Sequence, residues 1–405
     1  MAHAPAPTDF DSSRFDHTPR TRLVFGDNAV ERVGELCREY GATRVLLVTD
    51  PGIVKAGHAA RVTDSLDQAG VPCTLFDQVR ENPTTHDVAA CLSVARAEKV
   101  DFLIGLGGGS SLDTAKGCNF ILTNGGEIKD YWGIGKATKA MLPLIAIPTT
   151  SGTGSECQSF ALIADADTHL KMACGDPKAA AKVAILDPTL TVSLPRSVTA
   201  NTGIDAIAHA VETAVTRKRN PLSLMYSREA FKLCVTSLPI VLKDPGNIVA
   251  RGQMLLGAAY AGTAIENSML GAAHSAANPL TAHYNTVHGT AVGMMLPLVV
   301  RYNSDNPEAL QCYAELASAS EIATVSGGLR SALEALISRM ETLLNLAGMP
   351  RSLSDLGVQV ETIPTMADEA SKQWTANFNP RPIAQEDFAR LYERAFDRRS
   401  DGDMV

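Results

Sequence analysis

The sequence DFLIGLGGGSSLDTAK occupies residues 101–116 and decides the fold. An apolar run of strand type leads directly into three glycines and two serines, and a helical pattern begins at Leu112. Glycines let the backbone approach an anion, and a serine can cap a helix whose free N–H groups attract phosphate. This arrangement predicts a dinucleotide phosphate loop, with an ordinary tight turn as the alternative. The loop residues are Gly107, Gly108, Gly109 and Ser110.

On either side of this loop, short apolar runs alternate with helical patterns between residues 44 and 187. Such alternation is typical of βαβ units and a parallel sheet. The predicted strands are residues 44–49, 73–76, 101–106 and 143–148, followed by shorter ones at 160–163, 170–173 and 183–186.

From Pro195 onward the pattern becomes long, Ala- and Leu-rich and helical, with no convincing strand. The predicted fold is therefore an α/β nucleotide-binding domain with a parallel sheet, followed by an all-α domain. The expected boundaries are a flexible tail at 1–16, the α/β domain at 17–193 and the helical domain at 194–405.

Composition narrows the class of protein. The chain has 405 residues, a formal net charge of −8 and no long cluster of Lys and Arg, which argues against a nucleic-acid partner. Eight cysteines are scattered without a C-x-x-C pair, as expected of buried thiols in a reducing compartment. The first residues lack the pattern of a signal peptide, and the strongest apolar run, 294–300, is far shorter than the ~20 residues of a membrane span. We expect a cytoplasmic protein without a membrane partner.

Two further loops follow predicted strands. Asp50 ends the first strand, where a carboxylate can accept both ribose hydroxyls of NAD and repel the 2′-phosphate of NADP. A turn aspartate before Pro51 and Gly52 is the alternative. Residues 148–156, PTTSGTGSE, offer hydroxyl and backbone donors at the end of another strand. This loop is either a generic Ser/Thr/Gly turn or a contact for ribose and nicotinamide.

Four side chains form a candidate metal site. Asp205 and His209 are four residues apart, so in a helix they project from the same face. His274 and His288 are separated by fourteen residues and lie in segments of small side chains. Each histidine alone is more often an ordinary packed or surface residue. One carboxylate and three imidazoles together suit Fe²⁺, Zn²⁺ or Ni²⁺ and leave room for a substrate oxygen.

With these motifs in order, the chain resembles the iron-containing (group III) alcohol dehydrogenases. The resemblance rests on D-x-x-x-H at 205–209, on His274 and the step to His288, on GGGSxxDxxK at 107–116 and on PTTxGT at 148–153. It extends from about residue 21 to the NPRP segment at 379–382.

The resemblance implies a dehydroquinate synthase-like fold and a homo-oligomer. It also implies hydride transfer between NAD and a small alcohol, aldehyde or ketone, with a divalent metal acting as Lewis acid. The implied metal ligands are Asp205, His209, His274 and His288. The implied cofactor contacts are Asp50, Asn82, Gly107, Gly108, Gly109, Ser110, Asp113, Thr149, Thr150, Thr153 and Lys171.

One position departs from the family pattern. Many relatives carry a histidine four residues after the third ligand, where it is assigned to proton transfer, whereas this chain has Asn278. An amide cannot shuttle protons at neutral pH. His283 is the candidate replacement, unless it merely packs beside Tyr284 or the proton leaves through water and cofactor hydroxyls. Two other functions stay open at this point: a non-redox lyase like dehydroquinate synthase, and a nucleotide-binding paralogue without catalysis.

Overall fold

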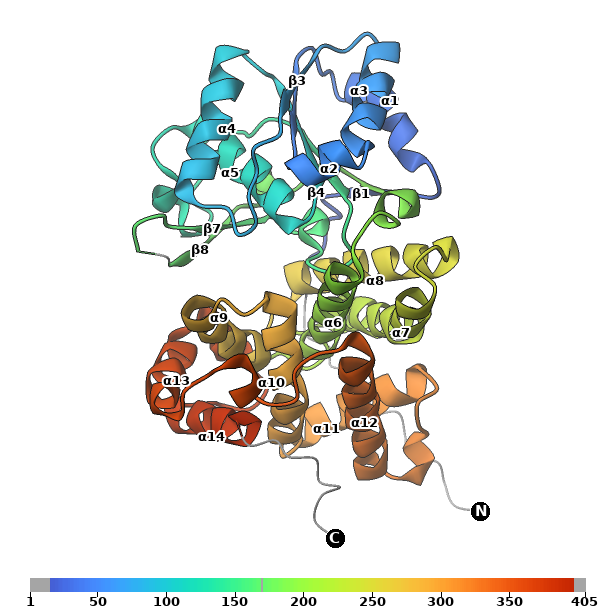
Figure 1. Ribbon diagram of the computed structural model, residues 1–405, viewed down its shortest axis with the longest axis vertical. Helices are drawn as coiled ribbons and strands as arrows, with labels where there is room; N and C mark the ends of the chain where they lie inside the picture. Colours follow the sequence, from blue (N-terminus) through green and yellow to red (C-terminus); the bar gives the residue numbers. More distant parts are fainter. Residues whose placement is uncertain (1–14, 169, 397–405) are drawn as a thin grey trace.

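The computed structural model describes residues 15–168 and 170–396. The tail expected at residues 1–16 therefore lies outside the described residues, except for its last two positions. Figure 1 shows a sheet flanked by helices in the first half of the chain and a helical body in the second half.

A six-stranded parallel sheet forms the centre of the first half, with the strand order β1-β9-β6-β4-β2-β3. Its strands are β1 (Arg22–Phe25), β2 (Val45–Val48), β3 (Cys73–Phe76), β4 (Phe102–Gly107), β6 (Leu144–Pro148) and β9 (Val183–Leu186). The central strands β2, β4, β6 and β9 are buried along their whole length. Both faces of a parallel sheet are covered by helices, so these strands are continuously apolar.

Alternating side chains of β2 enter two different cores. Leu46 and Val48 pack with residues of α4 (Thr85–Ala97) and α5 (Gly109–Asn124), whereas Val45 and Leu47 pack with residues of α1 (Val33–Glu39) and α3 (His58–Gln68). This is the twofold period of a strand covered on both sides, and Figure 1 shows the two helical layers on either side of the sheet. The predicted parallel α/β arrangement is confirmed.

A second, three-stranded sheet with the order β5-β8-β7 lies outside the parallel one. It contains β5 (Gly133–Ile134), β7 (Phe160–Ala164) and β8 (Lys171–Gly175), and β7 pairs antiparallel with β8. The strands expected at 160–163 and 170–173 therefore exist but form a hairpin. The sequence analysis missed β1 and β5, which are short and partly exposed.

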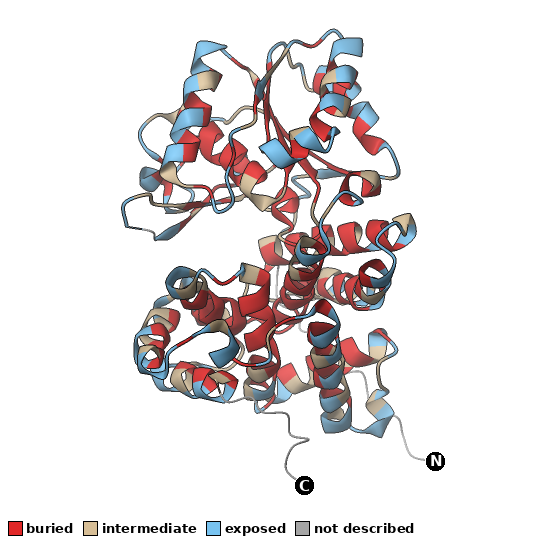
Figure 2. Ribbon diagram, viewed as in Figure 1, coloured by how far each residue is buried: buried red, intermediate tan, exposed pale blue. Residues whose placement is uncertain are grey.

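Within the described residues, no strand follows β9. The second half consists of α6 (Arg196–Thr213), α7 (Pro221–Lys243), α8 (Ile248–Asn267), α9 (Ala272–Tyr284), α10 (His288–Asn303), α11 (Pro307–Ala319), α12 (Leu329–Ala347), α13 (Ile363–Lys372) and α14 (Gln385–Phe396). One hydrophobic core joins them, and α6, which is buried along most of its length, lies next to the first half (Figure 2). The all-α prediction is confirmed; the domain boundary between residues 193 and 194 stays a prediction.

Candidate metal and cofactor site

Helix α6 provides the first two residues of the candidate metal site. Asp205 and His209 lie one helical turn apart, and the Oδ1 of Asp205 is 3.4 Å from the Nε2 of His209. His274, in the first turn of α9, places its Nε2 3.5 Å from the same oxygen. His288 begins α10 and places its Nε2 3.8 Å from it. Three helices thus bring all four predicted ligands around one carboxylate oxygen.

Small residues allow these helices to approach one another. A Cβ atom on Gly289 would lie 2.1 Å from the carbonyl oxygen of Asn201 in α6, so only glycine fits directly after His288. The His209 and His274 rings are stacked with centroids 4.8 Å apart, and the His274 and His288 rings are 5.4 Å apart. This explains why the histidines occur in segments of small side chains.

The donor atoms fit a divalent cation. Asp205 Oδ1 and His274 Nε2 are buried without a hydrogen-bond partner, which is costly unless another group satisfies them. His288 turns its Nε2 toward the same oxygen of Asp205, and its Nδ1, on the other side of the ring, is also buried without a partner. The ligand atoms of Asp205, His209 and His274 all lie within 4.8 Å of one another. The His288 ring is at the edge of this cluster, with 30% of its side chain exposed. A carboxylate with imidazoles is a donor set suited to iron, zinc or nickel.

The electrostatics of the cluster differ among its members. Burial would raise the pKa of Asp205, but the surrounding imidazoles hold it well below its usual range. Burial lowers the pKa of His209 and lowers that of His288 to about 3, so both imidazoles are neutral at neutral pH. For His274 burial is outweighed by the carboxylates of Glu212 and Asp205, which raise its pKa to about 9. A bound cation would displace the proton that these carboxylates favour on His274.

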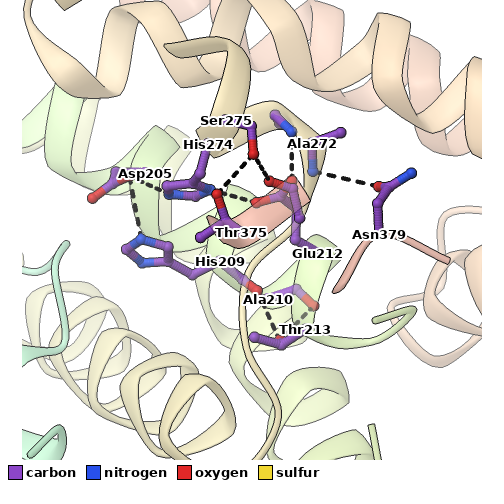
Figure 3. Close-up of polar contacts among 12 residues, drawn as sticks. Asp205, His209, Ala210, Glu212, Thr213, Ala272, His274, Ser275, Thr375 and Asn379 are labelled. Carbon is purple, nitrogen blue, oxygen red and sulfur yellow. Dashed lines mark hydrogen bonds and ion pairs between the residues drawn. The ribbon is translucent and has the colours of Figure 1, made fainter. Parts of the chain in front are cut away.

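Glu212 supports the cluster and was missed by the sequence analysis. One of its carboxylate oxygens accepts a hydrogen bond from Nδ1 of His274, and the other accepts one from the backbone N–H of Ala273 at 2.7 Å (Figure 3). The ring is thereby held with Nε2 toward Asp205. The signal was present in the sequence, since Glu212 lies seven residues after Asp205 and therefore on the same face of α6.

His209 links the metal cluster to the loop at residues 148–156. Its Nδ1 donates a hydrogen bond to the carbonyl oxygen of Gly152 at 3.2 Å, which turns Nε2 toward Asp205. The same loop meets the glycine loop, because a Cβ on Gly109 would lie 2.8 Å from the Thr153 side chain. The metal cluster, the loop at 148–156 and the glycine loop are therefore in contact one after another.

The glycine loop has the geometry expected for an anion. Gly108 is the N-cap of α5, and Gly107 has a φ of +142°, a conformation that favours glycine. A Cβ on Gly107 would lie 2.5 Å from Ser111 Oγ and 3.3 Å from Oδ2 of Asp50. The backbone N–H of Asn82 donates to Ser110 Oγ at 3.3 Å. Both Asp50 and Asn82 thus lie beside the glycine loop, and their contacts with a cofactor stay a prediction.

The threonine residues of the second loop face the same region. A Cβ on Gly108 would lie 3.4 Å from the Thr150 side chain. The hydroxyls of Thr149 and Ser111 are buried without a hydrogen-bond partner, which leaves unused polar groups next to the glycine loop. The arrangement suits a polar ligand that spans both loops.

Lys171 and Asp113 occupy different environments. Lys171 is the exposed first residue of β8, and its amine lies near enough to the carboxylates of Asp113 and Asp205 to interact with their charges. Asp113 is engaged by the protein: its oxygens accept hydrogen bonds from Ser155 Oγ at 2.7 Å and from the N–H of Leu162 at 3.1 Å. A cofactor contact through Asp113 stays a prediction that these bonds do not support.

The candidate proton relay lies elsewhere. Nε2 of His283 and a carboxylate oxygen of Glu369 form a hydrogen bond of 2.8 Å, and 39% of the His283 side chain is exposed. Asn278 donates a hydrogen bond to the Gln373 side chain at 3.0 Å. None of the contacts found in the described chain links His283 to the metal cluster, so its role as a relay stays a prediction without structural support.

The structure combines an α/β half and a helical half. One loop joins a cluster of a carboxylate and histidines to a glycine loop of the kind that binds nucleotides. This combination defines a class of protein, the metal-dependent dehydrogenases. Residues 19–188 match the iron-containing alcohol dehydrogenase family, and residues 199–396 match the C-terminal part of the Fe-containing alcohol dehydrogenase family. The chain belongs to the iron-containing alcohol dehydrogenase family and is an oxidoreductase.

Individual relatives agree with this assignment. The chain is 34% identical to 1,3-propanediol dehydrogenase of Klebsiella pneumoniae, over 94% of this chain and 99% of the relative. It is 33% identical to the NAD-dependent methanol dehydrogenase of Bacillus methanolicus, over 92% and 97%. Among solved structures, an alcohol dehydrogenase from Oenococcus oeni superposes with a TM-score of 0.90 at 33% identity, covering 95% of this chain and 100% of that one. These relatives confirm the predicted family and class of reaction. In the described part of the chain, no helix combines the length and apolarity that a membrane crossing requires.

Proposed function

We propose that this protein is a metal-dependent, NAD-linked alcohol dehydrogenase that interconverts a small alcohol with its aldehyde or ketone. The observation that carries the proposal is the buried cluster of Asp205, His209 and His274, which is joined through Gly152 to the loops beside Asp50. Its unpartnered donor atoms need a cation. Relatives named as dehydrogenases and reductases of small alcohols and aldehydes support the substrate class.

The metal would be held by Asp205, His209, His274 and His288. We propose Fe²⁺, with Zn²⁺ and Ni²⁺ as competitors for the same donors. When bound, the metal supplies Lewis acidity and the nicotinamide supplies hydride chemistry. The protein contributes orientation: Glu212 fixes the His274 ring, and the Gly152 carbonyl fixes the His209 ring.

The cofactor would be NAD rather than NADP. The Oδ1 of Asp50 accepts hydrogen bonds from the N–H groups of Gly52 and Ile53, which fixes the carboxylate at the end of β2. Its Oδ2 faces the glycine loop and is available to ribose hydroxyls, and its charge would repel a 2′-phosphate. The N–H groups of the Gly107–Ser110 turn would bind the pyrophosphate.

The alcohol proton would leave without a histidine at position 278. Asn278 cannot accept it, and His283, near the end of α9, is held by Glu369 of α13. We propose that water and the cofactor hydroxyls carry the proton. We further propose that the protein is a homo-oligomer in the cytoplasm; its eight free cysteines, of which seven are buried, are consistent with a reducing compartment.

Metal removal and reconstitution test the proposal. Purified protein is stripped with a chelator, reloaded with Fe²⁺, Zn²⁺ or Ni²⁺, and assayed by NADH absorbance with a panel of short alcohols and aldehydes. We expect turnover to disappear on stripping and to return with at least one metal. His274→Ala should lose both bound metal and turnover, while the control His283→Ala should keep both. Full turnover without bound metal would refute the proposal. Loss of turnover in His283→Ala with metal retained would instead support His283 as the proton relay.

A further inference from the structure

Arg251, in α8, is a buried cation without an anionic partner. Only 3% of the residue is exposed, yet its Nε donates to the carbonyl oxygen of Pro245 at 3.0 Å and its Nη1 donates to the Thr199 hydroxyl at 3.1 Å. Both acceptors are neutral. Across residues 15–168 and 170–396, no carboxylate forms an ion pair with Arg251, and burial lowers its pKa without an opposing acid. A buried charge without a counter-charge is unfavourable.

A small cavity adjoins this guanidinium. Its volume is about 10 Å³, and it is lined by the polar side chains of Arg251, Thr199, Ser151 and Thr202 and by the apolar side chains of Leu194, Val241 and Met254. That space holds one water molecule or one small ion. Its size excludes a phosphate or a substrate-sized carboxylate.

Three of the four polar residues in the cavity wall, Arg251, Thr199 and Ser151, can donate hydrogen bonds into the cavity. The fourth, Thr202, already donates its hydroxyl proton to the carbonyl oxygen of Val198 at 2.9 Å. Ser151 is 8% exposed, and its hydroxyl has no hydrogen-bond partner in the described chain. The Thr199 hydroxyl accepts from Arg251, so its own proton is free to point into the cavity. Thr199 also lies in the first turn of α6, where the helix dipole is positive. A cation would be repelled, and a water molecule would leave the guanidinium charge uncompensated.

We propose that a monovalent anion of the size of chloride binds in this cavity between Arg251, Thr199 and Ser151. The anion neutralises the buried guanidinium and accepts the hydroxyl protons. It also holds the loop at Ser151, whose neighbour Gly152 accepts the hydrogen bond from His209. The site is separate from the metal cluster and takes neither cofactor nor substrate.

Thermal unfolding of the metal-loaded protein in two salts tests the proposal. Sodium chloride is compared with sodium gluconate at equal ionic strength, because gluconate is too large for the cavity. We expect the midpoint of wild type to be higher in saturating chloride by roughly 2 to 4 °C. The difference should vanish in Arg251→Met and shrink in Ser151→Ala. It should persist in Arg330→Met, a control that removes an exposed arginine paired with Asp305.

Crystals grown with bromide give an independent readout that does not depend on the variants. An anomalous peak in the cavity, within hydrogen-bond distance of Arg251, is expected. Equal midpoints in the two salts together with no bromide peak would overturn the proposal. A chloride effect that persists in both Arg251→Met and Ser151→Ala would also overturn it, because it would arise elsewhere on the surface. If Arg251→Met does not fold, Ser151→Ala and the bromide crystals decide.

Discussion

Glu212 determines which nitrogen of His274 faces the metal position. Its carboxylate accepts the Nδ1 proton and also anchors the backbone of Ala273, so the ring and the start of α9 are fixed together. Partners of this kind typically account for 10- to 100-fold in metal affinity. A single carboxylate outside the ligand set therefore controls its geometry.

Glu212→Gln should weaken metal binding by roughly 10- to 100-fold, because the neutral amide holds the ring less firmly and makes it less basic. Competition with a coloured chelator measures the affinity. Glu369→Gln is the matched control, since it removes a carboxylate beside His283, outside the cluster. Equal affinities in Glu212→Gln and wild type would show that Glu212 has no such role.

Glu156 makes the stability of the protein depend on pH. Its carboxyl is buried with Oε1 unpartnered, and burial raises its pKa to about 7 from an ordinary value of 4.5, although Lys116 opposes the shift. The folded protein thus binds this proton more tightly than the unfolded chain. The free energy of unfolding should therefore fall as the pH rises between about 4.5 and 7.

Glu156→Gln should remove this contribution to the pH dependence of the free energy of unfolding. Between about pH 4.5 and pH 8, the free energy of unfolding of wild type is expected to fall by on the order of 2 to 3 kcal/mol more than that of the variant. Urea unfolding at several pH values measures the difference, with the exposed Glu98→Gln as control. Parallel pH profiles for wild type and Glu156→Gln would contradict the assignment.

At the scale of elements, helix α5 is tied to the neighbouring loop and hairpin by a fully buried lysine. Lys116 Nζ donates to the carbonyl oxygen and the hydroxyl of Ser155, at 2.6 and 2.8 Å, and to the carbonyl oxygen of Phe160 at 2.9 Å. The start of α5 carries the glycine loop, and Ser155 follows the threonine loop. This one side chain therefore fixes the position of the glycine loop relative to the threonine loop.

Lys116→Met should destabilise the protein by about 3 kcal/mol or more, because the apolar side chain removes three charge-assisted hydrogen bonds to buried oxygens. Urea denaturation gives the free energy, and the exposed Lys129→Met serves as control. A loss below about 1 kcal/mol, similar to that of the control, would mean that water replaces the ammonium group.

The periodicity of apolar residues predicted the elements that are buried on both faces or that are bounded by Gly and Pro. Strands β2, β4 and β6 and the all-helical second half were found because their apolar patterns are long and continuous. β1 was missed because it is a four-residue edge strand with three exposed side chains, and β5 because it has two residues. The antiparallel pairing of β7 with β8 depends on tertiary contacts, which the periodicity of the sequence does not reveal.

The same contrast applies to the candidate site. Asp205 and His209 followed from helical spacing, whereas His274 and His288 were added from their segments of small side chains and from the donor chemistry, and the family pattern then implied the same four ligands. His283 was proposed from its closeness in sequence to Asn278, yet it lies more than two helical turns beyond His274 and pairs with Glu369. Glu212 and the Gly152 carbonyl depend on contacts between elements, which spacing alone does not reveal.

On the scale of the whole molecule, the metal cluster joins three helices of the second half and, through the His209 contact with Gly152, a loop of the first half. Its unpartnered atoms are buried in the middle of α6 and at the starts of α9 and α10. Glu212 holds the start of α9, but the imidazoles of His274 and His288 lie only within 3.5 and 3.8 Å of Asp205 Oδ1, so a shared cation would add the link between the three helices. Bound metal should therefore stabilise the assembled fold rather than the site alone.

Removing the metal should lower the thermal midpoint by roughly 5 °C or more at constant chloride, because a ligand that binds only the folded state stabilises it by mass action. Hydrogen exchange should accelerate first at the amides following His274 and His288, since these helix starts lose their shared ligand. The exposed face of α14, far along the chain from the ligands, is the internal reference. Unchanged exchange at both helix starts, with full metal removal verified, would show that the second half is assembled by its apolar core alone. In that case the cluster would serve chemistry only, and metal content would affect turnover without affecting stability.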